Sequence, residues 1–308
     1  MINNPFSARE SGLSISRGAA RATEFPGLVE PSAELIPKGL PGMFSAVEES
    51  GFMFDRKFMP GVSDLALEAE LIEISDHGKT REESGHLVFF GQLLLNADDE
   101  GEHSLHVAVK PFDNVREAAQ EYAVESYFAE GKVPQCETFT PLGVTRLPEG
   151  QIGIVSHYRH SVRSMDGIFW NEDLVTDSDI TRKALGRAGV SLGLLHSAGW
   201  THGDAQVKNV AWDVTRPFDS TIVPDLEDAR PVNHLGRIEQ DELKERDLDT
   251  FISSLFQLQE AGYKLPYDYG DQIKEHFGIV YTGTNQNISA TKSAIDISVI
   301  ARIVDRNI

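Results

Sequence analysis

The chain has 308 residues, of which 40% are hydrophobic and 25% are charged, the ordinary profile of a globular protein. Acidic residues outnumber Lys and Arg by 48 to 28, and the net charge of -20 disfavours nucleic acid and membrane surfaces as general partners. The single cysteine, Cys136, excludes an internal disulfide, which fits a reducing compartment. No apolar run approaches the roughly 20 residues of a membrane helix and no signal peptide is visible, so we expect a cytoplasmic protein.

The N-terminal half predicts a sheet with one helix. Residues 1–45 are rich in Ser, Gly, Pro and Glu without periodicity, which predicts a flexible extension. Beyond them, the apolar pattern predicts a helix over residues 115–128 and strands over residues 71–74, 86–95, 105–110, 139–146 and 152–158. In the strand that ends at Lys110, the side chains of Leu105, Val107 and Val109 lie on one face. Those of Ala108 and Lys110 lie on the opposite face.

The C-terminal half predicts mainly helices. Apolar residues recur with helical spacing from Leu185 to Leu195, and Gly199 is a typical helix stop. Two short strands, around residues 210–212 and 221–223, precede a helix from about Leu243 to Glu260. The order of elements predicts an α+β fold in two lobes, an N-lobe over residues 46–160 and a C-lobe over residues 161–308.

The loop from His202 to Asn209 carries the strongest chemical pattern in the chain. Asp204 and Asn209 lie five positions apart, just after a predicted helix and turn. Phosphoryl transfer needs few protein groups, namely a residue that positions the acceptor hydroxyl and ligands for magnesium. Asp204 suits the first role and Asn209 the second, because hard cations take oxygen ligands. The alternative for Asp204 is an ordinary helix or turn cap.

Two further segments complete this pattern. A predicted strand leads into Asp225, whose carboxylate would be the second magnesium ligand beside Asn209. Lys110 would meet the α- and β-phosphates of a nucleotide and needs an acidic partner to hold it. Glu117, Glu121 and Glu125 are spaced four apart on one helix face, and any of the three could reach it.

These segments resemble the protein-kinase-like superfamily, which includes protein kinases and the aminoglycoside and choline phosphotransferases. Val107-Ala108-Val109-Lys110 is similar to the third-strand lysine motif, which implies that Ala108 and Lys110 bind the nucleotide. Counting back from the next family segment makes Glu121 the best match to the helix glutamate that pairs with this lysine, and Glu125 the second. The resemblance implies a two-lobed fold with an antiparallel-sheet N-lobe carrying one helix and a mostly helical C-lobe.

The catalytic loop carries the most specific part of the resemblance. His202-x-Asp204-x4-Asn209 is similar to the family loop in the His-Gly-Asp form of the small-molecule branch, and Asp225 is similar to the metal-binding aspartate. Lys208 stands where tyrosine kinases place an arginine, which implies a contact with the γ-phosphate or the acceptor. The alternative for Lys208 is a plain surface charge.

Two other residues of the C-terminal half have roles that the resemblance suggests. His202 is expected to brace the catalytic loop through a hydrogen bond to the backbone, and the alternative for it is a base. Asp247 is similar to the helix aspartate that bonds the backbone of this loop, and the alternative for it is a surface position.

The sequence also departs from the family. No Gly-x-Gly-x-x-Gly stands between the first two predicted strands, where only Gly78 and Gly85 are found. Glu227 replaces the glycine of Asp-Phe-Gly, and Gly203 stands where many protein kinases have arginine. We therefore expect no regulation by phosphorylation of an activation loop.

Three functions follow from these patterns. The first, which we favour over the other two, is an ATP- and Mg2+-dependent kinase that phosphorylates a protein Ser/Thr hydroxyl, because no large helical insertion follows Asp247. The second is a small-molecule kinase of the aminoglycoside or choline type, which the His-Gly-Asp sequence of the catalytic loop favours. The third is a pseudokinase that binds nucleotide without turnover, which the missing glycine loop favours and the intact site residues disfavour.

Overall fold

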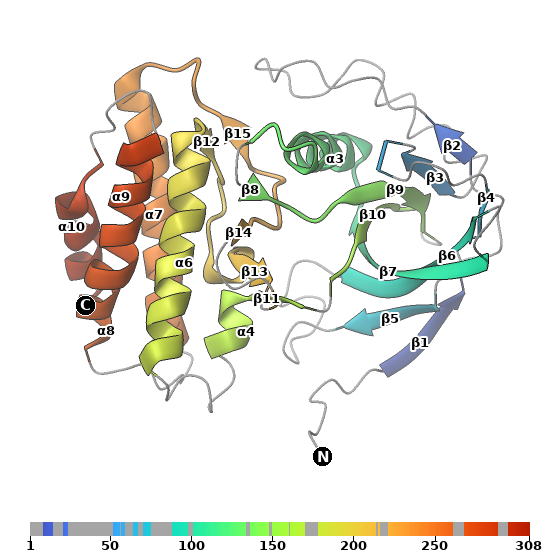
Figure 1. Ribbon diagram of the computed structural model, residues 1–308, viewed down its shortest axis with the longest axis horizontal. Coiled ribbons are helices and arrows are strands. Elements are labelled where there is room, and N and C mark those ends of the chain that lie inside the picture. Colours follow the sequence, from blue (N-terminus) through green and yellow to red (C-terminus); the bar gives the residue numbers. More distant parts are fainter. Residues whose placement is uncertain are drawn as a thin grey trace. The chain divides into compact units, whose positions relative to one another are not determined.

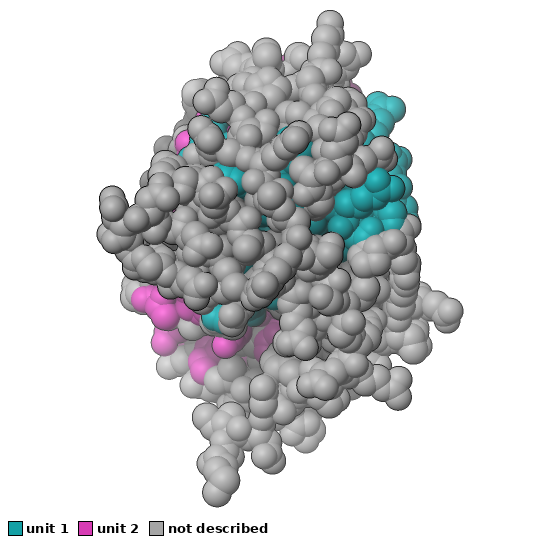
Figure 2. Space-filling model, turned by 90° about the vertical axis from the view of Figure 1, so that its right-hand side faces the viewer, with its two compact units in different colours: residues 1–126, 139–159 teal, residues 127–138, 160–308 magenta. Residues whose placement is uncertain are grey.

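The structure is a computed structural model, and it describes residues 9–14, 21–23, 52–55, 57–58, 64–66, 70–74, 88–97, 101–133, 136–147, 150–159, 161–169, 178–213, 215, 221–260, 268–288 and 295–308. The chain divides into two compact units, residues 1–126 with 139–159 and residues 127–138 with 160–308 (Figure 2). The predicted lobes, which meet at residues 160 and 161, stay a prediction. Within the described residues, no helix combines the length and the apolar character needed to cross a membrane.

The first unit is built on a nine-stranded sheet of the described residues (Figure 1). In spatial order its main path is β1 (Arg9–Ser14), β5 (Glu70–Ile74), β6 (Val88–Ala97), β7 (Gly101–Phe112), β10 (Ile152–His157), β9 (Pro141–Arg146), β3 (Phe52–Asp55) and β2 (Arg21–Thr23). The remaining strand, β4 (Asp64–Ala66), pairs with β6. Neighbours are antiparallel except for β2 and β3, which run parallel.

Strands β1 and β2 lie within residues 1–45, for which the sequence predicts a flexible extension. The structure pairs β1 with β5 and β2 with β3. Strand β3 follows a little later and pairs with β9, opposite Gly143, Val144 and Thr145. The predicted strands over residues 71–74, 86–95, 105–110, 139–146 and 152–158 are confirmed as β5, β6, β7, β9 and β10.

Helix α3 (Val115–Ala129) follows β7 directly and confirms the predicted helix. Its first turn is capped by Asn114, whose side-chain oxygen accepts a hydrogen bond from the Arg116 N–H at 2.8 Å. One face carries small or aromatic residues with helical spacing and packs on the sheet. That face and the sheet form one buried cluster, which comprises Met53, Phe112, Ala118, Ala119, Tyr122, Ala123, Val144, Ile152 and Ile154.

The second unit is mostly helical. Its helices in chain order are α4 (Met165–Phe169), α6 (Ser178–Ser197), η2 (Val207–Asn209), α7 (Arg237–Glu260), α8 (Tyr269–Gln272), η3 (Ile273–Gly278), α9 (Ile279–Ile288) and α10 (Ile297–Asn307). Two small sheets accompany them, with the strand orders β11 (Val162–Ser164), β13 (Ala211–Asp213), β14 (Thr221–Ile222), β8 (Cys136–Glu137) and β12 (Trp200–Thr201), β15 (Arg230–Pro231). The predicted α+β fold class is confirmed, since a sheet unit with one helix accompanies a mostly helical unit.

Small residues bring the long helices of this unit close together. Helix α6 packs against α9, and α7 packs against α10 (Figure 1). A Cβ atom on Gly189 of α6 would lie 2.7 Å from the Phe277 carbonyl oxygen, and one on Gly193 would lie 2.8 Å from Thr284 Cβ. Only glycine leaves room for this approach. The predicted helix stop is confirmed at Gly199, whose φ is +79°.

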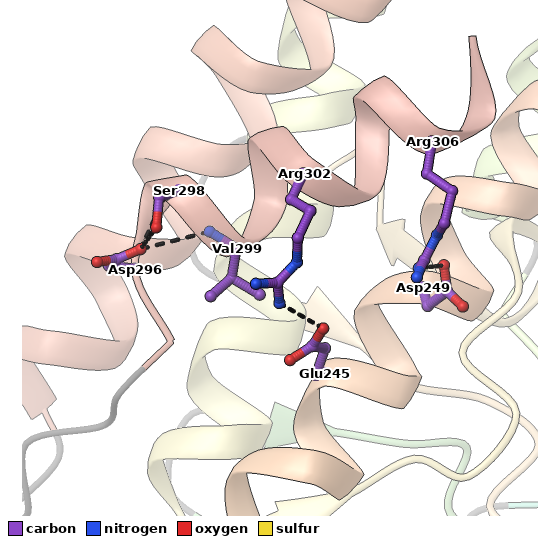
Figure 3. A network of polar contacts seen from close by, with 7 residues as sticks. All are labelled: Glu245, Asp249, Asp296, Ser298, Val299, Arg302 and Arg306. Atoms are coloured by element: carbon purple, nitrogen blue, oxygen red, sulfur yellow. Dashed lines mark hydrogen bonds and ion pairs between the residues drawn. The ribbon is translucent and has the colours of Figure 1, made fainter.

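Helix α10 combines a buried apolar face with surface ion pairs (Figure 3). Asp296 caps its N-terminus and accepts hydrogen bonds from Ser298 N at 2.8 Å and Val299 N at 3.3 Å. Its inner face is formed by Ile300, Ile303 and Val304, all fully buried. Arg302 and Arg306 reach across to α7, where they form ion pairs with Glu245 and Asp249.

Candidate active site

The loop of residues 202–209, called the catalytic loop after its predicted role, runs from the end of β12 into η2 and is held by its own side chains. The Asn209 Nδ2 donates to the Asp204 backbone oxygen at 3.0 Å and to Asp204 Oδ2 at 3.1 Å. The Gln206 Nε2 donates to Asp204 Oδ1 at 2.8 Å. Both carboxylate oxygens of Asp204 therefore accept a hydrogen bond from within the loop, and the loop fixes the rotamer of this side chain.

Asp247 anchors this loop from helix α7. Its Oδ2 accepts a hydrogen bond from the His202 N–H at 2.6 Å, and its Oδ1 accepts one from the Gly203 N–H at 2.9 Å. Asp247 is 1% exposed, so the alternative of a surface position is wrong. Two consecutive backbone donors bound to one carboxylate determine where the loop leaves β12, immediately before Asp204.

Asp247 is itself held by two residues distant in sequence. His196 Nε2 lies 3.0 Å from Asp247 Oδ2, and His196 Nδ1 lies 2.7 Å from the Tyr281 hydroxyl. Burial lowers the pKa of His196 and keeps its ring neutral. Burial opposes ionisation of Asp247, but the hydrogen bonds from His196 and His202 hold its pKa below the usual value.

These charge states define the direction of each hydrogen bond in the network. A neutral imidazole has one donor and one acceptor nitrogen, and the carboxylate of Asp247 can only accept. Nε2–H of His196 therefore donates to Asp247, and Nδ1 accepts from the hydroxyl of Tyr281. Burial raises the pKa of Tyr281, so this hydroxyl remains a donor.

His202 does not have its expected contact. Its ring is fully buried, and among the described residues neither ring nitrogen has a hydrogen-bond partner. The expectation that this ring braces the loop through a hydrogen bond is wrong, because Asp247 performs that task. Lys208 lies in η2 and is half-buried.

Asp225 lies on the turn after β14, next to other carboxylates. It has φ of 59°, a left-handed conformation that aspartate adopts more readily than most residues. Partial burial raises the pKa of Asp228, and the charges of Glu227, Asp204 and Asp225 raise it further. The second unit therefore brings the carboxylates of Asp204, Asp225 and Glu227 near that of Asp228.

Gly203 fits the loop for a steric reason. Its φ is +84°, and a Cβ atom at this position would lie 2.5 Å from the Asp228 carbonyl oxygen. The loop conformation thus excludes any side chain immediately before Asp204.

The nucleotide-binding candidates lie in the first unit. The Lys110 Nζ contacts both Glu121 carboxylate oxygens, at 3.1 Å and 2.9 Å. The side chain of Glu121 is 2% exposed and that of Lys110 is 16% exposed. Ala108, on the same strand face as Lys110, is half-buried.

The neighbouring glutamates make different contacts. Glu117 is exposed and accepts a hydrogen bond from Asn114 Nδ2 at 3.3 Å. Glu125 is buried and accepts one from the Ser156 hydroxyl at 3.4 Å. Of the three candidates that the helix spacing leaves open, Glu121 is the one whose pairing with Lys110 the structure gives.

Some sequence features fall outside this site. Gly78 and Gly85, which precede β6 in the sequence, lie outside the described residues. Cys136 is buried, and burial raises the pKa of its thiol to about 12, so it is no nucleophile. Asp228 and Tyr281 were not found by sequence reasoning. Asp228 could have been noticed as a carboxylate close behind Asp225, whereas nothing in the sequence marks Tyr281.

Comparisons with known proteins add little to this geometry. No family model matches the chain. No curated protein matches its sequence. A solved structure described as WaaP in complex with acyl carrier protein is similar at 17% identity and a TM-score of 0.43, over 76% of this chain and 81% of that one. Both values are too low for this likeness to support a conclusion about function.

Proposed function

We propose that the chain is an ATP- and Mg2+-dependent phosphotransferase that moves the γ-phosphate to a hydroxyl acceptor. The observation that carries this proposal is the arrangement of the catalytic loop, in which Asn209 and Asp204 are joined by a side-chain hydrogen bond and Asp247 anchors the backbone before them. Phosphoryl transfer passes through a loose transition state, so the protein mainly has to position the reactants and neutralise their charge. A loop whose carboxylate is fixed on both oxygens meets the first requirement.

Asp204 would accept a hydrogen bond from the acceptor hydroxyl and take its proton late in the transfer. This role requires a carboxylate of defined orientation, which Gln206 and Asn209 provide. Lys208, two residues after Gln206 in η2, would contact the γ-phosphate or the acceptor.

Asn209 and Asp225 would hold the magnesium ion. Because Asn209 directs its Nδ2 toward Asp204, its Oδ1 is the atom that a hard cation would bind. The raised pKa of Asp228 supports this fit, since partial burial and neighbouring carboxylates disfavour its charge and a divalent cation would reverse that effect. Bound magnesium would neutralise charge on the phosphates of ATP.

Lys110 would contact the α- and β-phosphates of ATP, with Glu121 holding its ammonium, and Ala108 would lie against the base. The ion pair of Lys110 with Glu121 supports this role, because a buried carboxylate fixes the ammonium at the end of an otherwise flexible stem.

A small-molecule acceptor is the second candidate beside a protein Ser or Thr. Gly203 favours it, because its left-handed backbone and the adjacent Asp228 carbonyl leave no space for the arginine that many protein kinases carry there. Separating protein-bound from soluble label after incubation with γ-labelled ATP, magnesium and a lysate distinguishes the two acceptor classes.

The phosphotransferase proposal is tested with purified protein and two substitutions. Asp225→Asn should abolish transfer and remove the magnesium dependence of ATP binding, and Lys110→Met should weaken ATP binding itself. Lys132→Met is the matched control, because Lys132 also pairs with a glutamate but lies on the surface. Wild-type transfer in both Asp225→Asn and Lys110→Met would overturn the proposal. A protein that binds ATP but transfers no phosphate would support the pseudokinase alternative.

A further inference from the structure

Strand β3 lies against the helix that carries Glu121. All four of its residues, Phe52 to Asp55, are buried, and Met53 belongs to the same cluster as Ala118, Tyr122 and Ala123 of α3. The strand reaches this position from a part of the sequence that precedes the predicted nucleotide-binding strands.

The strand ends in a buried carboxylate that binds the helix. Asp55 is 2% exposed, and its Oδ2 accepts a hydrogen bond from the Tyr122 hydroxyl at 3.2 Å. Its Oδ1 accepts one from the Lys57 N–H at 2.9 Å, and the Phe58 N–H donates to its backbone oxygen at 3.2 Å. Burial and the charge of Asp55 raise the pKa of Tyr122, so the hydroxyl remains a donor.

A glycine on the neighbouring strand β9 leaves the space that β3 needs to pair with it. Gly143 of β9 is paired with Phe54, and a Cβ atom on Gly143 would collide with the Met53 carbonyl oxygen and lie 2.7 Å from Phe54 Cα. Backbone atoms cannot yield as the end of a flexible side chain can. The position of β3 therefore depends on the missing side chain of Gly143.

Tyr122 follows Glu121 directly in the chain. A rotation or shift of α3 that broke the contact of Tyr122 with Asp55 would move Glu121 relative to Lys110 by a similar amount, because one helical turn behaves as a rigid body. The Glu121 carboxylate lies 2.9 Å from the Lys110 ammonium, and a displacement of about 1 Å would end this contact as a hydrogen bond.

We infer that Asp55 and Tyr122 are positioning residues that fix helix α3 to strand β3 and thereby hold Glu121 against Lys110. One consequence is that β3 influences the affinity for ATP, and this consequence rests on the proposed function. The ion pair itself can be followed without any activity.

The test uses two substitutions that leave Lys110 and Glu121 in place. Tyr122→Phe removes the hydroxyl and keeps the ring in its cluster, and Gly143→Ala displaces β3 from β9. Tyr127→Phe on the same helix and Gly186→Ala, where a Cβ atom would meet nothing within 4 Å, are the matched controls. Thermal unfolding establishes which variants are folded, and Tyr122→Phe keeps the test open if Gly143→Ala does not fold.

Two readouts are compared. The first is the rate at which acetic anhydride labels Lys110, measured by mass spectrometry and normalised to Lys132. The second is the dissociation constant of Mg-ATP. Labelling of Lys110 should rise severalfold, and ATP should bind about threefold to tenfold more weakly, in Tyr122→Phe but in neither control. In a Glu121→Gln background the effect of Tyr122→Phe on ATP should vanish, because its route to Lys110 is already removed.

The outcomes separate the inference from the proposed function. Unchanged labelling of Lys110 in folded Tyr122→Phe would overturn the inference, and so would an equal loss of ATP affinity with and without Glu121. Faster labelling in a protein whose wild type binds no ATP would support the positioning role of Tyr122 and refute the proposed function.

Discussion

His196 donates a hydrogen bond to Asp247 over 3.0 Å, with both side chains buried and with helices α6 and α7 joined by this contact. The consequence reaches the catalytic loop, because the same carboxylate accepts the backbone N–H groups of His202 and Gly203. The position of Asp204 therefore depends on Asp247, which lies on another helix, and on the histidine that holds Asp247 in place.

The network should make stability depend on pH. The folded pKa of His196 is lowered by burial, so its stabilising contribution is present above its unfolded pKa of about 6.5 and declines as the pH falls below that value. We expect the free energy of unfolding to fall between about pH 7.5 and about pH 5.5, by at most about 1.4 kcal/mol per pH unit from this group.

Chemical denaturation across this range measures the dependence. His196→Gln keeps a donor toward Asp247 without a titrating ring, so its stability should change less steeply with pH. The exposed His234 provides the control substitution His234→Gln, which should retain the slope of the wild type. Equal slopes in all three proteins would contradict this account of His196.

Asp204 should govern the rate of transfer and not the binding of nucleotide. Asp204→Asn keeps the size of the side chain and removes its ability to accept a proton, and such assistance contributes about 10²- to 10⁴-fold. We expect kcat to fall at least about 100-fold while the dissociation constant of ATP barely changes. Steady-state kinetics and equilibrium binding measure the two quantities, with Asp249→Asn, at a partly exposed aspartate of α7, as the control. A parallel loss of ATP affinity would place Asp204 elsewhere in the site.

Gly203 should tolerate no side chain. Gly203→Ala combines an unfavourable left-handed backbone with the close approach of the Asp228 carbonyl oxygen, and strain of this kind costs about 1–3 kcal/mol. We expect a corresponding loss in the free energy of unfolding, together with lower turnover because the displaced loop carries Asp204. Gly236→Ala serves as the control, since a Cβ atom there meets nothing within 4 Å. Wild-type stability of Gly203→Ala would show that the loop relaxes easily.

The apolar face of α10 should stabilise the second unit more than its ion pairs do. Ile303 is fully buried, and its truncation to Ala is expected to cost about 2–5 kcal/mol. The pair of Arg306 with Asp249 is exposed to solvent, so Arg306→Ala should cost no more than about 1 kcal/mol (Figure 3). Denaturant titrations at low and high salt check both values. Salt should reduce the effect of Arg306→Ala alone, and a larger effect for Arg306 than for Ile303 would contradict this order.

Local patterns in the sequence were sufficient for the main elements. Helix α3 and the strand before it follow from periodicity. The spacing of Glu117, Glu121 and Glu125 on one face of this helix limited the predicted partners of Lys110 to these three residues. Helix α7 was predicted too short, because its first turns carry no apolar stripe: Ile238 and Glu239 are both exposed. A pattern of burial cannot mark residues that are not buried.

Apart from the contact of Asp247 with the loop, which the resemblance implied, contacts between distant segments could not be predicted. His196 and Tyr281 are 85 positions apart, and neither carries a motif. Strand β3 also gave no signal, because all four residues are buried and a strand covered on both faces lacks the alternation of polar and apolar positions. The function assigned to His202 was wrong for a related reason, since the backbone donors of its loop are bound by Asp247 from another helix.

The place of β3 beside β9 has a consequence for the solubility of shortened forms of the protein. A chain that began after Asp55 would leave β9 at the rim of its sheet, with a row of unpaired N–H and C=O groups along residues 143–145. Such rims pair readily with strands of other molecules. We therefore expect a fragment that lacks β3 to self-associate more readily than one that retains it.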